Sequence, residues 1–221
     1  MPRATINIGD AAGQAATNAT WKYAIGFVPG QENEGLVANG EGSPCRLPGY
    51  DDSGWETCQD LSVGISSGFT FAWYRTTITI PETVNGRPTN GMRVQFETCV
   101  DDYGEIWIDG ECNRDRGTVQ GFNVAQRVQV SSDATPGAQH TIAILAANGP
   151  LAAPFGTVFV RFANLGFEWT GALVQWAQRP NRAVLRSEAG WILALLAGAV
   201  PPLAHHMGLG YEGATGKGSG I

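Results

Sequence analysis

The sequence predicts an all-β protein, an antiparallel β-sandwich, on three observations. Turn-forming residues are abundant, with 30 glycines and 12 prolines among 221 residues. Only 15% of the residues are charged, which suits a turn-rich β protein better than a helical one. Runs rich in β-branched and aromatic residues recur about every ten to twenty residues, without helical periodicity between them.

The first predicted strand is Thr20–Ile25, followed by a long loop, Pro29–Tyr50, rich in Gly, Asn, Glu and Pro. Residues 71–80 (FAWYRTTITI) give the clearest strand signal, because β-branched and aromatic side chains fill the run and Pro81 stops it. Residues 82–91 form a polar connection.

The later strands follow the same logic. Residues 93–100 alternate apolar and polar side chains, and residues 104–109 are predicted as their hairpin partner. Residues 119–130 supply one or two short strands. Residues 140–147 are apolar on both faces, which predicts a central strand, and residues 157–169 close the series.

The stretch from Val100 to Glu111 (VDDYGEIWIDGE) is the most informative. Alternation predicts that Ile106 and Ile108 face the core while Trp107 and the acids stay near the surface, and Asp-Gly then predicts a tight turn. A sheet rim with acids and an aromatic suits polyhydroxylated ligands or a hard cation. An ordinary turn is the alternative.

We expect two regions, a sandwich domain over residues 1–169 and an apolar, Gly-rich C-terminal tail over 170–221. Within the tail, residues 182–197 have the composition and spacing of an amphipathic helix, which would pack on the sandwich or on another subunit and form a homo-oligomer. Residues 208–221 are Gly-rich and predicted to be disordered.

Charge excludes some partners. A net charge of −6 and a pI near 5.0 argue against nucleic acid and against anionic membrane surfaces. The apolar run of residues 190–204 is too short to span a membrane and contains Pro201-Pro202. No signal peptide is visible at residues 1–13.

The four cysteines are compatible with two local disulfides, Cys45–Cys58 and Cys99–Cys112, although four cysteines allow three pairings. Paired cysteines would favour an extracellular or periplasmic location, and four thiols in an intracellular protein are the alternative. Zinc is not expected, because there is no CxxC motif and the histidines lie far from the cysteines in the sequence.

Several motifs occur in a characteristic order: Asp51-Asp-Ser-Gly-Trp55, Trp73-Tyr-Arg75, the stretch 100–110, Gly121-Phe-Asn123, Pro136-Gly137 and Ala147-Asn-Gly-Pro-Leu151. Together they resemble the galactose-binding-like jelly-roll domain that serves as the sugar-binding domain of family 2 glycoside hydrolases. They look closer still to the N-terminal accessory domain of gluconolactonase-like (SMP-30 family) proteins. The resemblance covers about residues 20–169 and implies this fold and a possible affinity for glycans. It does not imply hydrolysis, because nothing after residue 170 could build the catalytic propeller.

The candidate ligand-binding residues are aromatic or polar. An exposed Trp73 or Trp107 would stack on a pyranose, and Asp102, Asn123 and Asn148 would bind its hydroxyls with Tyr103 alongside. Each has a structural alternative: a turn, a cap or a core position. For Arg75 the alternative is an ion pair with a carboxylate such as Glu97, with Tyr74 in the core.

No cofactor is required by the sequence, but Asp101 and Asp102 together could hold a structural calcium ion. The same two acids fail as a glycosidase pair, because neighbours in one turn do not flank a scissile bond. No G-x-S-x-G motif is present either.

Three functions follow in order of preference. The first is a non-catalytic carbohydrate-binding module that recognises polysaccharide or oligosaccharide. The second is a structural or assembly module that forms oligomer or fibre contacts. The third is a lactonase or glycosidase fragment.

Overall fold

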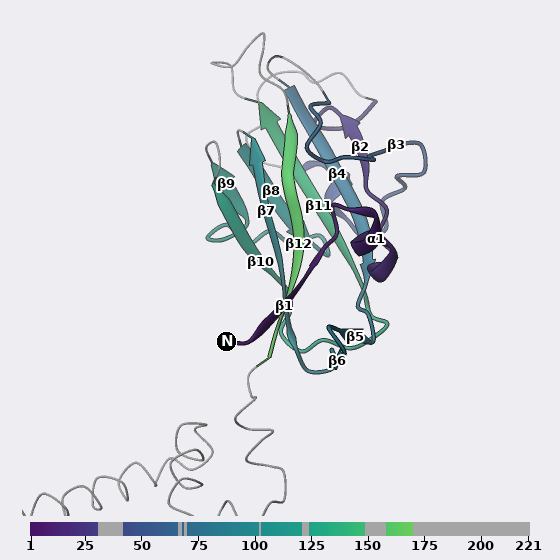
Figure 1. Ribbon diagram of the computed structural model, residues 1–221. Helices are drawn as coiled ribbons and strands as arrows, with labels where there is room; N and C mark the ends of the chain where they lie inside the picture. The colour runs from purple at the N-terminus through teal and green to yellow at the C-terminus, as the bar shows by residue number, and fades with distance from the viewer. Residues whose placement is uncertain are drawn as a thin grey trace, which may run out of the picture. The chain divides into compact units, whose positions relative to one another are not determined.

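The computed structural model describes residues 1–30, 42–65, 68, 70–101, 103–120, 124–148 and 158–169. Within Arg3–Glu168 two antiparallel sheets pack on each other, which confirms the predicted all-β sandwich (Figure 1). The tail, residues 170–221, lies outside the described residues, and with it the predicted helix, the predicted disorder and the predicted oligomer contacts. No helix among the described residues is long and apolar enough to cross a membrane.

The smaller sheet has four strands in the order β1-β12-β7-β10, and the larger has six in the order β3-β2-β4-β11-β8-β9. A separate two-stranded ribbon, β5-β6, lies within the predicted polar connection. The strands are β1 (Arg3–Asn7), β2 (Lys22–Ile25), β3 (Glu56–Thr57), β4 (Thr70–Thr79), β5 (Thr83–Val84), β6 (Arg87–Pro88), β7 (Arg93–Asp101), β8 (Tyr103–Ile108), β9 (Thr118–Gln120), β10 (Ala125–Ser131), β11 (Gln139–Asn148) and β12 (Phe159–Glu168).

The strand β11 is central, as its two apolar faces predict. It pairs with β4 on one side along its whole length, from Gln139–Thr79 to Asn148–Thr70, and with β8 on the other. Because both of its edges are hydrogen-bonded and both of its faces are covered, an almost continuous apolar run fits there. Its eight residues from Thr141 to Asn148 are all buried.

The predicted hairpin between residues 93–100 and 104–109 is wrong. β7 pairs with β12 and β10 in the smaller sheet, whereas β8 pairs with β11 and β9 in the larger one. The chain therefore crosses from one sheet to the other between them. Gly104 lies so close to Val100 that an added Cβ would sit 3.0 Å from the valine side chain. Nearness in sequence favoured a local hairpin, but the apolar faces of both strands are buried by partners far away in the chain.

The core between the sheets comes from alternate residues. Tyr74, Ile106 and Ile144 of the larger sheet and Phe96 and Leu165 of the smaller sheet are fully buried. The Tyr74 hydroxyl donates a hydrogen bond of 3.3 Å to the Val158 carbonyl, which confirms that this residue belongs to the core. Ile106 and Ile108 are both buried, as predicted. The Asp109-Gly110 turn is also confirmed, with φ of 51° and 89°.

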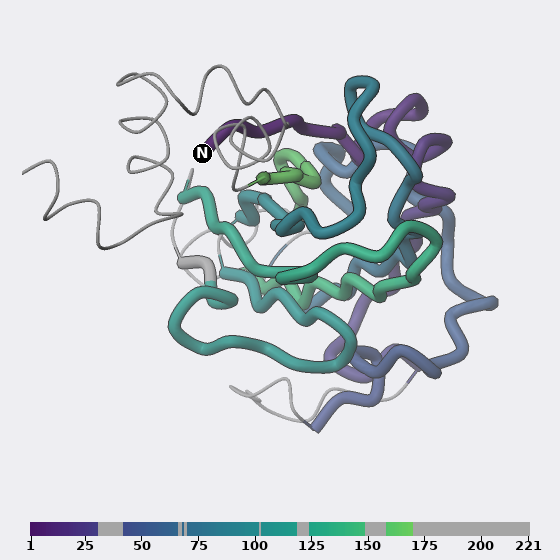
Figure 2. The backbone as a smooth tube through the Cα atoms, turned by 90° about the horizontal axis from the view of Figure 1, so that it is seen from below, coloured from purple at the N-terminus to yellow at the C-terminus, as the bar shows by residue number. Residues whose placement is uncertain are grey.

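The N-terminal segment adds two elements that the sequence did not reveal, β1 and the helix α1 (Ala11–Thr17). β1 pairs with β12 from Arg3–Glu168 to Asn7–Asn164, and the purple N-terminal segment lies next to the light-green segment in Figure 2. Asp10 caps α1 by accepting a 2.8 Å hydrogen bond from the Gly13 amide. A seven-residue helix is too short to display a periodic pattern, which is why the sequence did not reveal it.

Candidate functional site

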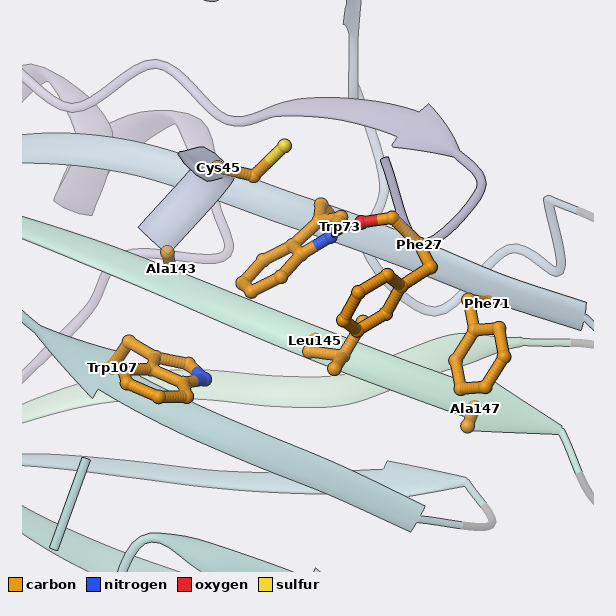
Figure 3. Packing of buried hydrophobic residues seen from close by; sticks show 8 residues of the cluster. All are labelled: Phe27, Cys45, Phe71, Trp73, Trp107, Ala143, Leu145 and Ala147. Atoms are coloured by element: carbon orange, nitrogen blue, oxygen red, sulfur yellow. Dashed lines mark hydrogen bonds between the residues drawn. The ribbon is translucent and has the colours of Figure 1, made fainter. Parts of the chain in front are cut away.

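The predicted aromatic residues gather on the outer face of the larger sheet, which faces away from the smaller sheet. Strand register places Trp73, Leu145 and Glu105 in one row and Arg75, Ala143 and Trp107 in the next. A chain segment containing Phe27 and a short 3-10 helix, η2 (Pro44–Arg46), contribute to the hydrophobic cluster on this face (Figure 3). The outer face is therefore a second buried layer of the molecule.

Trp73 lies inside this layer. Its side chain is 0% exposed, and the indole nitrogen donates a 2.9 Å hydrogen bond to the Phe27 carbonyl, seen beside it in Figure 3. The prediction that Trp73 is an exposed stacking platform is wrong, because a loop from a distant part of the sequence covers its face of the strand. Burial with a satisfied N–H group indicates a structural role.

Trp107 is likewise buried, with 2% exposure, so the prediction of an exposed ring is wrong here too. The guanidinium carbons of Arg46 and Arg114 each lie 5.3 Å from its ring centroid. The alternating pattern predicted that the Trp107 ring contacts solvent, but these two cation–π contacts cover the ring instead. Its indole nitrogen has no hydrogen-bond partner among the described residues.

Tyr103 hydrogen-bonds to a carboxylate that the sequence did not single out. Its hydroxyl donates a 2.9 Å hydrogen bond to Oε1 of Glu105, a residue with 0% exposure, and Arg114 donates to the same oxygen at 2.6 Å. Burial and the Glu105 hydrogen bond together raise the pKa of Tyr103 to about 12. Tyr103 is therefore held by the protein itself. Its position two residues from the acid on the same strand face is the signal that could have revealed Glu105.

The remaining polar candidates lie elsewhere. Asn148 is buried at the end of β11, where its amide donates a 2.8 Å hydrogen bond to the Gly68 carbonyl. Asp102 and Asn123 lie outside the described residues. Asp101 ends β7, and the described part of the chain contains no group of three metal-ligating side chains. A calcium site at Asp101 and Asp102 stays a prediction.

No disulfide joins Cys45, Cys58, Cys99 and Cys112, all four of which the structure describes, so the two predicted bridges are wrong. Cys99 lies in β7 of the smaller sheet, whereas Cys112 follows β8 of the larger one. Cys45 belongs to the buried cluster around Trp73, whereas the Cys58 amide hydrogen-bonds to the Trp21 carbonyl. Burial raises the pKa of both the Cys45 and the Cys58 thiols, so both resist ionisation.

An open groove of about 560 Å³ runs along β3, the edge strand of the larger sheet, and its neighbour β2. We call it the aromatic groove. Three partly exposed rings and two exposed carboxylates are among its lining residues. The described lining consists of Tyr23, Ala24, Ile25, Pro29, Gly30, Tyr50, Asp51, Gly54, Trp55, Glu56 and Ile65.

The rings and carboxylates of the aromatic groove are paired. Tyr50 and Trp55 lie with ring centroids 5.5 Å apart and planes tilted by 58°. The Tyr23 hydroxyl donates a 2.6 Å hydrogen bond to Oε2 of Glu56, and this bond raises the pKa of Tyr23. The Ser53 amide donates to Asp51 at 3.0 Å and lowers the pKa of that carboxyl. Asp51 therefore stays ionised at neutral pH.

Arg75 fixes the loop that carries Tyr50 and Trp55. The guanidinium, 2% exposed, donates to Oδ2 of Asp52 at 2.8 Å and to the carbonyls of Cys45 and Pro48 at 3.1 and 2.9 Å. The predicted ion pair between Arg75 and Glu97 is wrong, because Glu97 lies on β7 of the other sheet and pairs there with Arg3 and Arg127.

The motif at residues 51–55 forms a tight turn. The Ser53 amide donates a hydrogen bond to the Asp51 side chain, and the Trp55 amide donates one to the Asp52 carbonyl. Trp55 packs, partly exposed, against the outer-face cluster. Nothing in the local sequence pattern around Trp55 showed that Tyr23 and Tyr50 would lie on the same groove.

No family model and no curated protein matches this chain. Among solved structures, a β-glucuronidase from Ruminococcus gnavus in complex with D-glucuronic acid is similar over 75% of this chain and 30% of that chain, with 10% identity and a TM-score of 0.52. A β-glucuronidase 2 from Bacteroides uniformis is similar over 75% of this chain and 18% of that chain, with 17% identity and a TM-score of 0.50. A glycosyl hydrolase family 2 member from Bacteroides cellulosilyticus covers 74% of this chain and 20% of that chain, with 15% identity and a TM-score of 0.49.

The first two similarities confirm the expected fold, a β-sandwich like one found within β-glucuronidases. At such low identity they show the fold alone. This chain spans less than a third of the length of those enzymes.

Proposed function

We propose that this protein is a non-catalytic carbohydrate-binding module and that the sugar binds in the aromatic groove. The observation that carries the proposal is the combination of three aromatic rings with two carboxylates along one open groove of about 560 Å³. This volume lies within the range of small-ligand sites, roughly 300–1,000 Å³. The solved structures of the same fold belong to enzymes that act on sugars, which supports the class of ligand.

The chemistry of the groove suits a polyhydroxylated ring. A pyranose has an apolar face of C–H groups, which stacks on the Trp55 or Tyr50 ring, and a rim of hydroxyls. The carboxylate oxygens of Asp51 and Glu56 accept hydrogen bonds from those hydroxyls. Because the groove is open, few of these groups lose their water on binding, and we expect weak, millimolar to micromolar affinity.

The electrostatics favour binding over hydrolysis. A glycosidase general acid needs a carboxyl whose pKa is raised so that it carries a proton at neutral pH. The pKa of Asp51 is lowered instead. Tyr23 keeps its proton, since its pKa is raised. These groups accept or donate hydrogen bonds without transferring a proton.

Removal of the Trp55 ring tests the proposal. Wild-type protein is first screened on a glycan array and on affinity gels with mixed polysaccharides, and Trp55→Ala is then compared on the best ligand. We expect Trp55→Ala to weaken binding about tenfold, the loss of a central aromatic contact. Glu56→Gln keeps the shape of the groove and removes one charge, so its loss should be smaller, about threefold.

The matched control is Phe159→Ala, which removes a partly exposed ring on β12, outside the lining of the groove. Its affinity should stay within twofold of the wild type. Absence of retention on every glycan, or an equal loss in Trp55→Ala and Phe159→Ala, would contradict the proposal. Melting temperatures of all variants verify that each is folded.

A further inference from the structure

A second cavity, of about 510 Å³, lies where β7 and β10 of the smaller sheet meet the β8–β9 connection. We call it the arginine pocket. None of its described lining residues belongs to the aromatic groove, and none is an Asp or Glu. The described lining consists of Arg93, Gln95, Asn113, Arg116, Val128 and Gln129.

The arginine pocket is positive in a protein whose net charge is −6. Arg93 lies 3.9 Å from Glu168, but Arg127 binds that carboxylate more closely, at 3.1 Å, and lies 2.6 Å from Glu97. Arg3 also pairs with Glu97, so three arginines share two carboxylates and leave one positive charge uncompensated. Arg116 adds a second positive charge, and no ion pair joins it to a carboxylate of the described residues.

Amide side chains provide neutral donors beside these cations. Gln95 and Gln129 are directly opposite each other across the β7–β10 pair, so their side chains lie on the same face of the sheet. Gln95 is buried and Gln129 is exposed. The Asn113 side-chain oxygen accepts a 3.0 Å hydrogen bond from the Asp115 amide, which leaves its NH₂ group as the donor available for other contacts.

Backbone hydrogen bonds close the turn that carries Asn113 and Arg116. The amides of Arg116 and Gly117 both donate to the Asn113 carbonyl, the first at 3.1 Å. A Cβ on Gly117 would lie 2.7 Å from that carbonyl oxygen and 2.9 Å from the Cys112 sulfur, so this tight turn requires glycine. The backbone that carries these two residues is therefore fixed by the turn itself, which lowers the entropic cost of binding.

From these features we infer that the arginine pocket binds an oxyanion group, a carboxylate or sulfate. Guanidinium groups offer paired N–H donors that match the oxygens of such anions, and the amides add further donors. The anion would also relieve the repulsion between Arg93 and Arg116. The inference is independent of the sugar site, since the two cavities share no described lining residue.

Calorimetric titration of the full chain tests the inference with three probes: sodium sulfate, galacturonate and neutral galactose. Sulfate tests a free inorganic ion as the source of the oxyanion, and galacturonate tests an acidic sugar. We expect saturable millimolar binding of at least one anion. Arg116→Gln should weaken it at least tenfold, whereas Arg87→Gln, the same charge change on the β6 ribbon, should stay within twofold.

A second variant guards against loss of structure. Gln129→Glu places a carboxylate at an exposed position of the pocket and should abolish anion binding, while Gln59→Glu at an exposed position outside the lining should not. Failure of both anions to bind the wild type would overturn the inference. Equal losses in Arg116→Gln and Arg87→Gln would overturn it as well, because they indicate diffuse charge attraction only. Galactose binding that Gln129→Glu abolishes would overturn the inference too, because the pocket would then recognise the neutral sugar and not the anion.

Discussion

Arg75 joins the sheet to the loop above it. Its planar guanidinium donates to three backbone carbonyls and one carboxylate, and its carbon Cζ also lies 5.9 Å from the Tyr50 ring centroid. The rigid, planar guanidinium of arginine can donate to several acceptors at once, whereas the flexible ammonium group of lysine suits such an arrangement less well. The position of Tyr50 and Trp55 along the aromatic groove therefore depends on a buried charge one layer below.

Replacement of this residue should destabilise the whole sandwich. Arg75→Met leaves the carbonyls of Cys45 and Pro48 without their donor, and we expect the free energy of unfolding to fall by about 3 kcal/mol. Lys22→Met removes the other, more exposed partner of Asp52, and we expect a loss below about 1 kcal/mol. Urea unfolding followed by tryptophan fluorescence measures both. Equal losses would mean that Arg75 is not the principal support of the loop.

The burial of single residues was the hardest property to predict. The alternation around Ile106 correctly placed that residue and Ile108 in the core. The same alternation placed Trp107 in solvent, and it failed because Arg46, more than sixty positions away in the chain, and Arg114 cover its ring. A strand pattern states which face a side chain occupies. It does not state whether a distant loop covers that face.

At the scale of elements, the contact between α1 and β1 is unusually tight. A Cβ built on Gly13 would lie 1.7 Å from the backbone oxygen of Asn7, far closer than a carbon and an oxygen can approach without a covalent bond. The backbone of β1 cannot move away easily, because it is hydrogen-bonded to β12. The helix can rest on the strand only if this position is glycine.

Gly13→Ala should therefore push α1 away from β1. Glycine in a helix is normally less favourable than alanine, so an ordinary site would gain stability, but here overpacking should cost about 2–3 kcal/mol. Ala16→Ser, an exposed change in the same helix, is the control and should cost under about 0.5 kcal/mol. Thermal unfolding of the two variants decides the point. A Gly13→Ala protein as stable as the wild type would show that the helix does not pack this closely.

Strands were predictable in position, but their pairing was not. The run at residues 71–80 and the apolar run at 140–147 appear as β4 and β11 with nearly the expected bounds. The partner of β7 was not predictable, because short-range turn signals compete with pairings between residues some seventy positions apart, such as Arg93 with Glu168. β1 was not expected at all, since its five residues have too little apolar character to stand out.

The cysteines show how the whole molecule overrides local spacing. Their separations in sequence suggested bridges, but the sandwich distributes them over two sheets and a buried loop. Three of the four are buried, where a thiol behaves as a small apolar side chain. The stability of the sandwich must then come from packing between and outside its sheets.

Purified protein should contain four titratable thiols when it is unfolded without a reductant. Its melting temperature should be the same with and without dithiothreitol, because no covalent bridge constrains the unfolded chain. Thiol titration with Ellman's reagent in guanidinium chloride, combined with intact mass, measures this directly. Two missing thiols together with a lower melting temperature in reductant would show that a bridge exists.

The pairing of Arg3 with Glu168 brings the two ends of the sandwich to neighbouring positions on adjacent strands. An entry and an exit point so close together let a module be spliced into a surface loop of a host protein without stretching that loop. The same geometry permits circular permutation: a short linker could join Glu168 to Arg3, and new ends could be opened at the Pro136-Gly137 turn.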